Sequence, residues 1–237
     1  MSQMFVADVG GTNIRLALVE NGSLMHITKY LCKQFDTITD AITHFAREAN
    51  VDNFEYGCIA IACPVNDDLV KMTNHTWAFS KTALKKELNL ARLLVINDFS
   101  AVAYSLPTLT KEQVIQVGSG VPLEKGNIAV FGPGTGLGVE HLTWTSGGWQ
   151  TLDGEGGHVD FAPNDENDLI VWRYIKAKLG RVPAEELLSG RGLVNIYQAL
   201  ASHDGIETVF DDPADITKHA LANTDPTCVN AVQLFCR

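Results

Sequence analysis

The chain has 237 residues, of which 46% are hydrophobic and 19% charged, so it can build a sizeable core and is not expected to be disordered. Its net charge of −10 argues against a nucleic-acid-binding protein, which needs a basic surface. The N-terminal apolar stretch is short and interrupted by Asp8, and no run reaches the ~18–20 apolar residues of a membrane span, so we expect neither a signal peptide nor a membrane partner.

The first half of the chain alternates between strand and helix patterns. Apolar alternation and capping residues predict strands at 5–9, 14–19, 58–65 and 93–96, and helices at 38–49, 81–88 and 100–106. The first two strands form an antiparallel pair. The run at 58–65 is continuously apolar, which suits a sheet buried on both faces. This alternation predicts the α/β class.

The second half begins with a segment rich in turn residues, at 107–121. We therefore place a domain boundary near residue 110, with a small N-terminal domain at 1–110 and a partial large domain at 111–237. A second hairpin is expected from strands at 128–131 and 139–143. Helices are expected at 166–179, 184–188, 193–203 and from 216 to the end.

Each of the two predicted hairpins has a glycine-rich turn. In the first, Gly10 and Gly11 let backbone amides approach an anion, Thr12 adds a hydroxyl, and Asp8 can orient a hydrated Mg²⁺. An ordinary glycine hairpin explains this motif equally well. The sequence contains no P-loop motif.

The second turn alternates glycine with Pro133, Thr135 and Leu137. Four glycines fall within residues 132–138, more than a hairpin needs, which indicates that some group comes close to the backbone. We favour phosphate binding over a purely structural role. A dinucleotide-binding fold is disfavoured because no helix follows directly.

Asn97 and Asp98 follow the predicted strand at 93–96. Ligands of α/β sheets gather at the carboxyl ends of strands, where a carboxylate can accept the proton of an attacking hydroxyl during phosphoryl transfer. The alternative is that Asp98 caps the following helix.

Glu155 and His158 lie among three glycines and suit the vicinal hydroxyls of a sugar. A turn with a solvated glutamate explains them too. Glu185 and Glu186 after Pro183 are typical of a helix N-terminus. The five cysteines form no Cys-x-x-Cys pair, which predicts a reduced cytoplasmic protein without a zinc site.

Together these segments resemble the bacterial ATP-dependent glucokinases of the non-repressor type. The matching segments are 7–13, 58–64, 73–79 (Thr73-Asn74-His75-Thr76-Trp77-Ala78-Phe79), 96–99, 134–138, 154–163, 188–190 and 192–197. The resemblance implies the actin-like, hexokinase-type (ribonuclease H-like) α/β fold, with a ligand cleft between two domains.

The resemblance also implies roles for individual residues. Asp98 would be the catalytic base. The sugar hydroxyls would be held by Asn97, Asp98, Glu155, His158 and Glu185. The phosphates of ATP would be held by Ala7, Asp8, Val9, Gly10, Gly11, Thr12, Gly134, Thr135 and Gly136, with Mg²⁺ oriented by Asp8 through water.

The implied activity is transfer of the ATP γ-phosphate to the 6-hydroxyl of glucose, giving glucose 6-phosphate in glycolysis, by a cytoplasmic homodimer. Members of the family continue beyond the equivalent of Arg237 into a segment that grips adenosine, so we expect a truncated polypeptide. Three alternatives stay open: a kinase for a related hexose, a sugar-binding fragment with impaired catalysis, and a sugar-responsive regulator. Regulators of this fold carry a DNA-binding module and a Cys-rich zinc loop, neither of which is found here.

Overall fold

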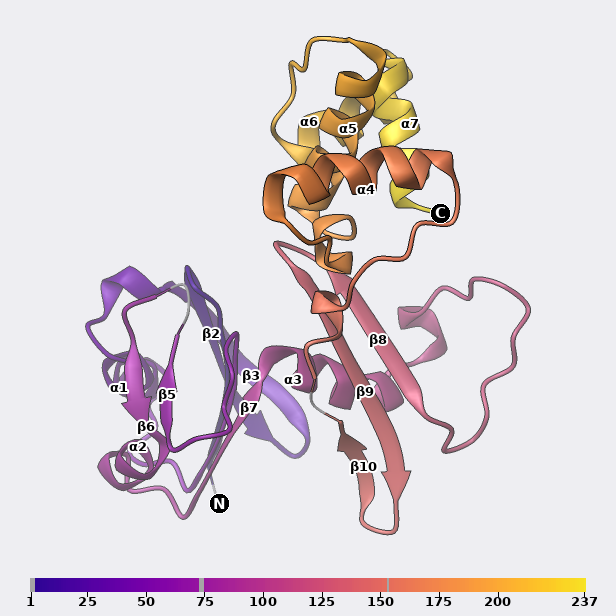
Figure 1. Cartoon of the computed structure of the whole chain (residues 1–237). Coiled ribbons are helices and arrows are strands. Elements are labelled where there is room, and N and C mark those ends of the chain that lie inside the picture. Colours follow the sequence, from indigo (N-terminus) through magenta and orange to yellow (C-terminus); the bar gives the residue numbers. More distant parts are fainter. Residues whose placement is uncertain (1–2, 73–74, 153) are drawn as a thin grey trace. The chain divides into compact units, whose positions relative to one another are not determined.

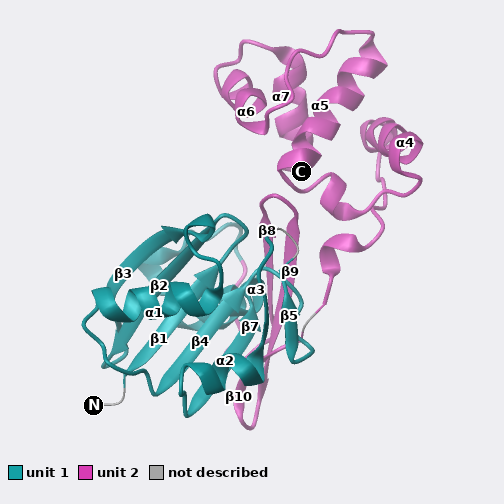
Figure 2. Cartoon of the chain, turned by 90° about the vertical axis from the view of Figure 1, so that its left-hand side faces the viewer, with its two compact units in different colours: residues 1–119 teal, residues 120–237 magenta. Residues whose placement is uncertain are grey.

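The computed structural model describes residues 3–72, 75–152 and 154–237, and it divides into two compact units, Met1–Ser119 and Gly120–Arg237 (Figure 1; Figure 2). The two domains expected at 1–110 and 111–237 stay a prediction. Thr73 and Asn74, which belong to one segment of the resemblance, lie outside the described residues. Within the described part of the chain, every helix is too short or too polar to cross a membrane.

The first unit is built on a mixed five-stranded sheet with the strand order β3-β2-β1-β4-β7. Its strands are β1 (Met4–Val9), β2 (Asn13–Glu20), β3 (Ser23–Leu31), β4 (Tyr56–Ile61) and β7 (Arg92–Asn97). β1, β2 and β3 pair antiparallel, whereas β1, β4 and β7 run parallel. The carboxyl ends of these three parallel strands therefore share one edge of the sheet.

Helices, a two-stranded sheet and short turns complete the first unit. The helices are α1 (Ile38–Glu48), α2 (Lys81–Glu87) and α3 (Asp98–Ser105), and the small sheet pairs β5 (Leu69–Lys71) with β6 (Ala78–Ser80). The 3₁₀ turns are η1 (Cys32–Gln34), η2 (Leu106–Thr108) and η3 (Lys111–Gln113). Thr37 caps α1 by accepting from Asp40 N, and Ser80 caps α2 by accepting from Ala83 N. Figure 2 shows α1 against the sheet, where Phe45 joins Phe5 in the core.

The second unit combines a small antiparallel sheet with four helices. The strands are β8 (Ile128–Pro133), β9 (Leu137–Thr145) and β10 (Gly148–Thr151), in the order β10-β9-β8. The helices are α4 (Glu166–Leu179), α5 (Gly190–Asp204), α6 (Pro213–Leu221) and α7 (Pro226–Phe235), with the 3₁₀ turns η4 (Gly156–His158) and η5 (Ala184–Glu186). Val171, Ile196 and Tyr197 are buried where the helices pack together.

Three predicted elements differ from the structure. The strand predicted at 58–65 ends at Ile61, because a tight turn follows in which Cys63 N–H donates to Ile61 O. The helix predicted at 184–188 is only the turn η5. The helix predicted from 216 onward is two helices, separated where Asn223 adopts a positive φ of 53° and Pro226 starts α7.

Four strands were missed by the sequence patterns, namely β3, β10 and the three-residue strands β5 and β6. Most side chains of β3 are exposed, so this edge strand shows no apolar alternation. His26 also has a positive φ of 50°, and the β2–β3 register shifts between Leu16 and Leu18. β10 has only four residues, which is too short for a periodic signal.

Candidate functional site

The first glycine turn connects β1 to β2, as predicted. Gly10 N–H donates to Asn13 O at 2.9 Å, so this amide is already used inside the turn. The turn's carbonyls are used as well: Thr12 O accepts from Cys32 N at 2.9 Å, and Gly10 O accepts from Cys32 Sγ at 3.4 Å. We therefore expect the amides of Gly11 and Thr12 to be the ones available to an anion.

Asp8 lies directly opposite Arg15 in the β1–β2 pair, and Arg15 Nη1 lies 2.7 Å from Asp8 Oδ2. Sequence reasoning missed Arg15, although the cross-strand register of a tight hairpin could have found it. The neighbouring side chains of Ala7 and Val9 are buried in the core. The predicted contacts of Ala7 and Val9 with ATP would therefore have to come from their backbone.

Asn97 and Asp98 lie at the carboxyl end of β7. The register aligns Val9 with Ile61 and Ile61 with Asn97, so the three parallel strands end together. Asn97 Oδ1 accepts from the amides of Phe99 (2.8 Å) and Ser100 (3.4 Å). Asn97 is therefore the N-cap of α3, and the alternative in which Asp98 caps this helix is wrong.

Asp98 is half-buried, and its Oδ1 accepts from Phe99 N at 2.9 Å. Burial raises the pKa of Asp98, the Phe99 amide partly lowers it, and the charge of Asp8 raises it again. Asp8 lies two strands away, about 10 Å at the usual strand spacing. A carboxylate with a raised pKa at the end of a parallel strand is well suited to accept a proton.

Glu185 contacts two of the segments in the second unit that were predicted to form the site. Its Oε2 accepts from the amide of Leu137, the first residue of β9, at 2.9 Å. Its Oε1 lies 3.8 Å from His158 Nε2. The structure therefore brings together Glu185, His158 and the end of the second glycine turn.

The second glycine turn is also partly closed by its own hydrogen bonds. Gly134 N–H donates to Gly136 O at 2.8 Å, and Gly134 O accepts from Gly190 N at 2.8 Å. A Cβ atom at Gly136 would collide with Glu185 Oε2. The group that approaches the backbone here is thus a carboxylate of the protein itself, a second reason for glycine besides the predicted phosphate.

The loop at 155–158 packs closely on β9. His158 N donates to Glu155 O at 3.0 Å, and a Cβ atom at the buried Gly157 would collide with Leu137 O. The side chains of Glu155 and His158 are exposed. The His158 side chain lies close to Glu185. Glu155 is positioned through its backbone carbonyl, which accepts from His158 N.

Arg191 was missed by sequence reasoning. Its guanidinium pairs with Glu185 Oε1 and lies 2.9 Å from Glu186 Oε1. The signal was present, because an arginine at the start of a helix opposes the helix dipole and implies a nearby acid.

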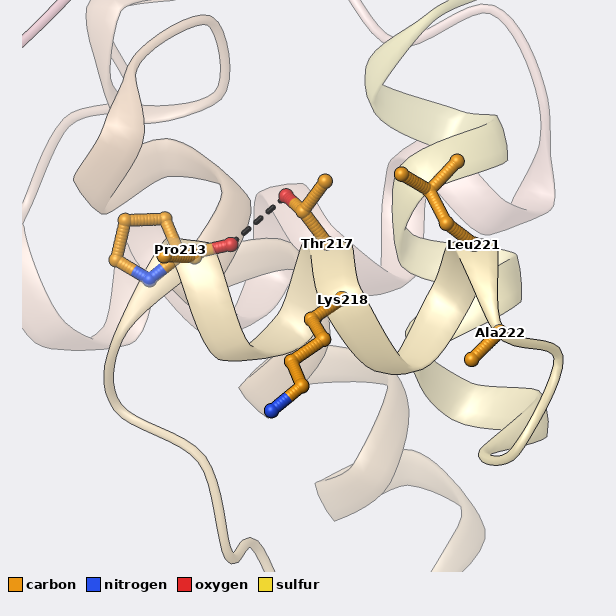
Figure 3. A pocket seen from close by; sticks show the side chains of 6 residues that line it. Pro213, Thr217, Lys218, Leu221 and Ala222 are labelled. Atoms are coloured by element: carbon orange, nitrogen blue, oxygen red, sulfur yellow. Dashed lines mark hydrogen bonds between the residues drawn. The ribbon is translucent and has the colours of Figure 1, made fainter.

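A pocket of about 760 Å³ lies along α6 (Figure 3). It is lined by Pro213, Ala214, Thr217, Lys218, Leu221 and Ala222. The Thr217 hydroxyl is already bonded to Pro213 O at 2.8 Å, the contact drawn in Figure 3. The predicted site residues all lie outside this pocket.

The mixed sheet, the glycine turn between β1 and β2, and the carboxylate after β7 define an actin-like, hexokinase-type sugar kinase fold. The chain is similar to the structure of a glucokinase from an Antarctic psychrotroph, with a TM-score of 0.90 and 30% identity over 100% of this chain and 76% of that one. It also resembles Balamuthia mandrillaris glucokinase in complex with glucose, with a TM-score of 0.75 and 22% identity over 99% and 73% of the two chains.

The sequence comparisons go further than the fold. The glucokinase family model matches residues 5–237. The chain is 47% identical over 233 residues to the glucokinase of Escherichia fergusonii, covering 98% of this chain and 72% of that protein. The chain belongs to the glucokinase family.

Proposed function

We propose that this chain transfers the γ-phosphate of ATP to the 6-hydroxyl of glucose, giving glucose 6-phosphate. Membership of the glucokinase family supports the reaction. The single structural observation that carries it is Asp98, a half-buried carboxylate at the carboxyl end of a parallel strand, with its pKa raised. The cytoplasmic location and the homodimer implied by the family belong to the same proposal.

Asp98 would accept the proton of the attacking hydroxyl. Burial and the nearby charge of Asp8 make this carboxylate more basic than an ordinary aspartate, so it is a better proton acceptor once ionised. The hydrogen bonds that Asn97 Oδ1 accepts from Phe99 N and Ser100 N fix the start of α3 and hold Asp98 in place. The sugar would be read by Asn97, Asp98, Glu155, His158 and Glu185.

The phosphates of ATP would lie against the two glycine turns, where free backbone amides can neutralise developing charge. Mg²⁺, when bound, would supply positive charge between the phosphates. Asp8 would hold such an ion through water, because it is an exposed carboxylate at the end of β1, beside the first glycine turn. The described residues contain no group of three or more His, Cys, Asp or Glu side chains that could hold a metal ion.

A coupled assay of ATP-dependent phosphorylation with glucose, mannose, galactose and fructose tests this proposal. We expect kcat/KM for glucose to exceed that for each other hexose by about 100-fold or more, because a sugar without a partner hydroxyl leaves buried polar groups unpaired. Equal values would indicate a broader hexose kinase. A glucose-induced change in tryptophan fluorescence without turnover would indicate a sugar-binding protein with impaired catalysis.

The pH dependence of the reaction should follow the raised pKa of Asp98. The base acts only when deprotonated, so kcat/KM for glucose at saturating ATP is expected to fall as the pH drops through this raised pKa. The charge of Asp8 contributes to the raised value. Asp8→Asn should therefore move the acid limb of the profile to lower pH, whatever its effect on the absolute rate.

A ¹³C NMR titration of the Asp98 carboxyl group in wild type and Asp8→Asn provides the same measurement without turnover. An unchanged or higher Asp98 pKa in Asp8→Asn would contradict the proposed interaction. Arg15→Gln is the matched control: it removes the cation opposite Asp8 and should leave the Asp8 charge more effective, which shifts the Asp98 pKa upward.

A further inference from the structure

Two adjacent carboxylates in the turn η5 are largely buried. The side chains of Glu185 and Glu186 are only 16% and 13% exposed. Taking two like charges out of water side by side is unfavourable unless a cation and hydrogen bonds compensate for it. The structure must therefore provide a counter-charge at this point.

Arg191 provides it. The guanidinium pairs with Glu185 Oε1 and lies 2.9 Å from Glu186 Oε1, so one cation serves both carboxylates. Arg191 lies in the first turn of α5, where the helix dipole disfavours positive charge and where acidic residues are absent. The two carboxylates account for a cation at this position.

The backbone around this pair is fixed as well. The buried Ser189 caps α5 by accepting from Gly192 N at 3.0 Å, and its hydroxyl donates to Glu185 O at 2.6 Å. Asn195 Nδ2 donates to Glu186 Oε2 at 3.0 Å. The start of α5 and the turn η5 are therefore held together, and Arg191 adds a contact to the Glu185 carboxylate.

Glu185 connects three groups with one carboxylate. Besides Arg191, its Oε1 lies 3.8 Å from His158 Nε2, and its Oε2 accepts from Leu137 N at 2.9 Å. His158 belongs to the loop proposed to bind sugar, and Leu137 directly follows the turn proposed to bind phosphate. The orientation of Glu185 thus affects both loops.

We propose that Arg191 is a positioning residue, which holds the Glu185 carboxylate in the orientation that serves both the sugar loop and the second glycine turn. This inference rests on the proposed function, because it takes Glu185 as a sugar ligand. Without Arg191, Glu185 would rotate away from Leu137 N and offer the sugar a mobile, more strongly solvated carboxylate. Glucose binding would weaken, while the chemical step, which depends on Asp98, would change less.

The first readout is kinetic, with Arg191→Ala, Arg191→Lys and the control Arg173→Ala. Arg173 makes an exposed pair with Glu166 on α4 at 3.1 Å and contacts none of these groups. We expect Arg191→Ala to raise KM for glucose about 10-fold, the effect of losing a charge-assisted contact, with kcat within about 3-fold. Arg191→Lys should recover part of this loss, since lysine keeps the charge but not the two-pronged geometry. Arg173→Ala should leave KM unchanged.

The second readout is hydrogen exchange of the Leu137 amide, followed by NMR. Arg191→Ala should lower Tm, because it leaves two largely buried carboxylates without their cation, and it should accelerate this exchange about 10-fold, because the carboxylate that protects the amide is released. This measurement needs no turnover, so it tests the positioning role even if the hexose assay contradicts the proposed kinase activity. An unchanged Leu137 exchange rate and an unchanged KM for glucose, with only Tm lowered, would overturn the inference and leave Arg191 a structural residue.

Discussion

Asp98→Asn is expected to lower kcat for glucose phosphorylation by about 10²- to 10⁴-fold, the usual contribution of a general base. Asparagine keeps the shape of the side chain and an oxygen that can accept from Phe99 N, as Asp98 Oδ1 does at 2.9 Å. It cannot accept a proton from the sugar hydroxyl. The loss should therefore appear mainly in kcat and much less in the affinity for glucose.

The stability of Asp98→Asn should change in the opposite direction. The pKa of Asp98 is raised in the folded protein, so the fold favours its protonated form. That contribution to stability is present below the unfolded pKa and is lost as the pH rises through the folded pKa. At neutral pH the ionised, half-buried carboxylate is unfavourable, and replacing it with a neutral amide should leave Tm unchanged or higher.

Asp40→Ala is the matched control for this pair of effects. Asp40 also lies in the first turn of a helix of the same unit, where it accepts from Thr37 N at 3.0 Å in a capping box. Its removal should lower stability by about 1 kcal/mol and leave kcat unchanged. Coupled kinetics and thermal melts of both variants test the argument. Wild-type kcat in Asp98→Asn would contradict the proposed base.

Local sequence patterns were sufficient to predict most helices and strands of the first unit. The paired strands around Gly10 and the caps at Thr37 and Ser80 are short-range features, with clear signals in apolar spacing and hydrogen-bonding side chains. The exposed edge strand β3 carried no such signal. Its position depends on pairing with β2, which is a tertiary interaction.

The residues of the candidate site also divide into those that local sequence patterns reveal and those that depend on tertiary contacts. The two turns and His158 could be selected from their glycines, and Asp98 from its position after a predicted strand. The partners Arg15 and Arg191 were missed, because the signal for each lies in a contact across a strand pair or between a turn and a helix and not in the residue alone. The role of Gly136 also depends on such a contact: a glutamate 49 positions later in the sequence approaches its backbone.

Gly136→Ala is expected to raise KM for glucose by about 10- to 100-fold, since displacing a charged hydrogen-bond partner costs about 1.5–3 kcal/mol. The added Cβ atom would occupy the place of Glu185 Oε2. Because this oxygen is the end of a flexible side chain, the fold can adapt by moving Glu185. The variant should therefore fold, with Tm slightly reduced, while Glu185 loses its bond to Leu137 N.

Three other glycines provide the comparison. Gly157→Ala should unfold or fail to express, because its Cβ atom would meet the backbone oxygen of Leu137, which cannot move aside. At Gly134 the added atom meets nothing within 4 Å, so Tm and glucose affinity should stay at wild-type values. If ATP phosphates approach this turn as proposed, Gly134→Ala should nevertheless raise KM for ATP. Gly120→Ala, also in open space, should change neither constant.

Steady-state kinetics with each substrate varied in turn, together with thermal melts, separate these cases. The arrangement around Glu185 requires that Gly136→Ala affect glucose more than ATP, and that Gly134→Ala affect ATP more than glucose. Equal effects of both variants on both substrates would mean that the turn responds as one unit. In that case the close approach of Glu185 to Gly136 would not explain a separate effect of the turn on glucose and on ATP.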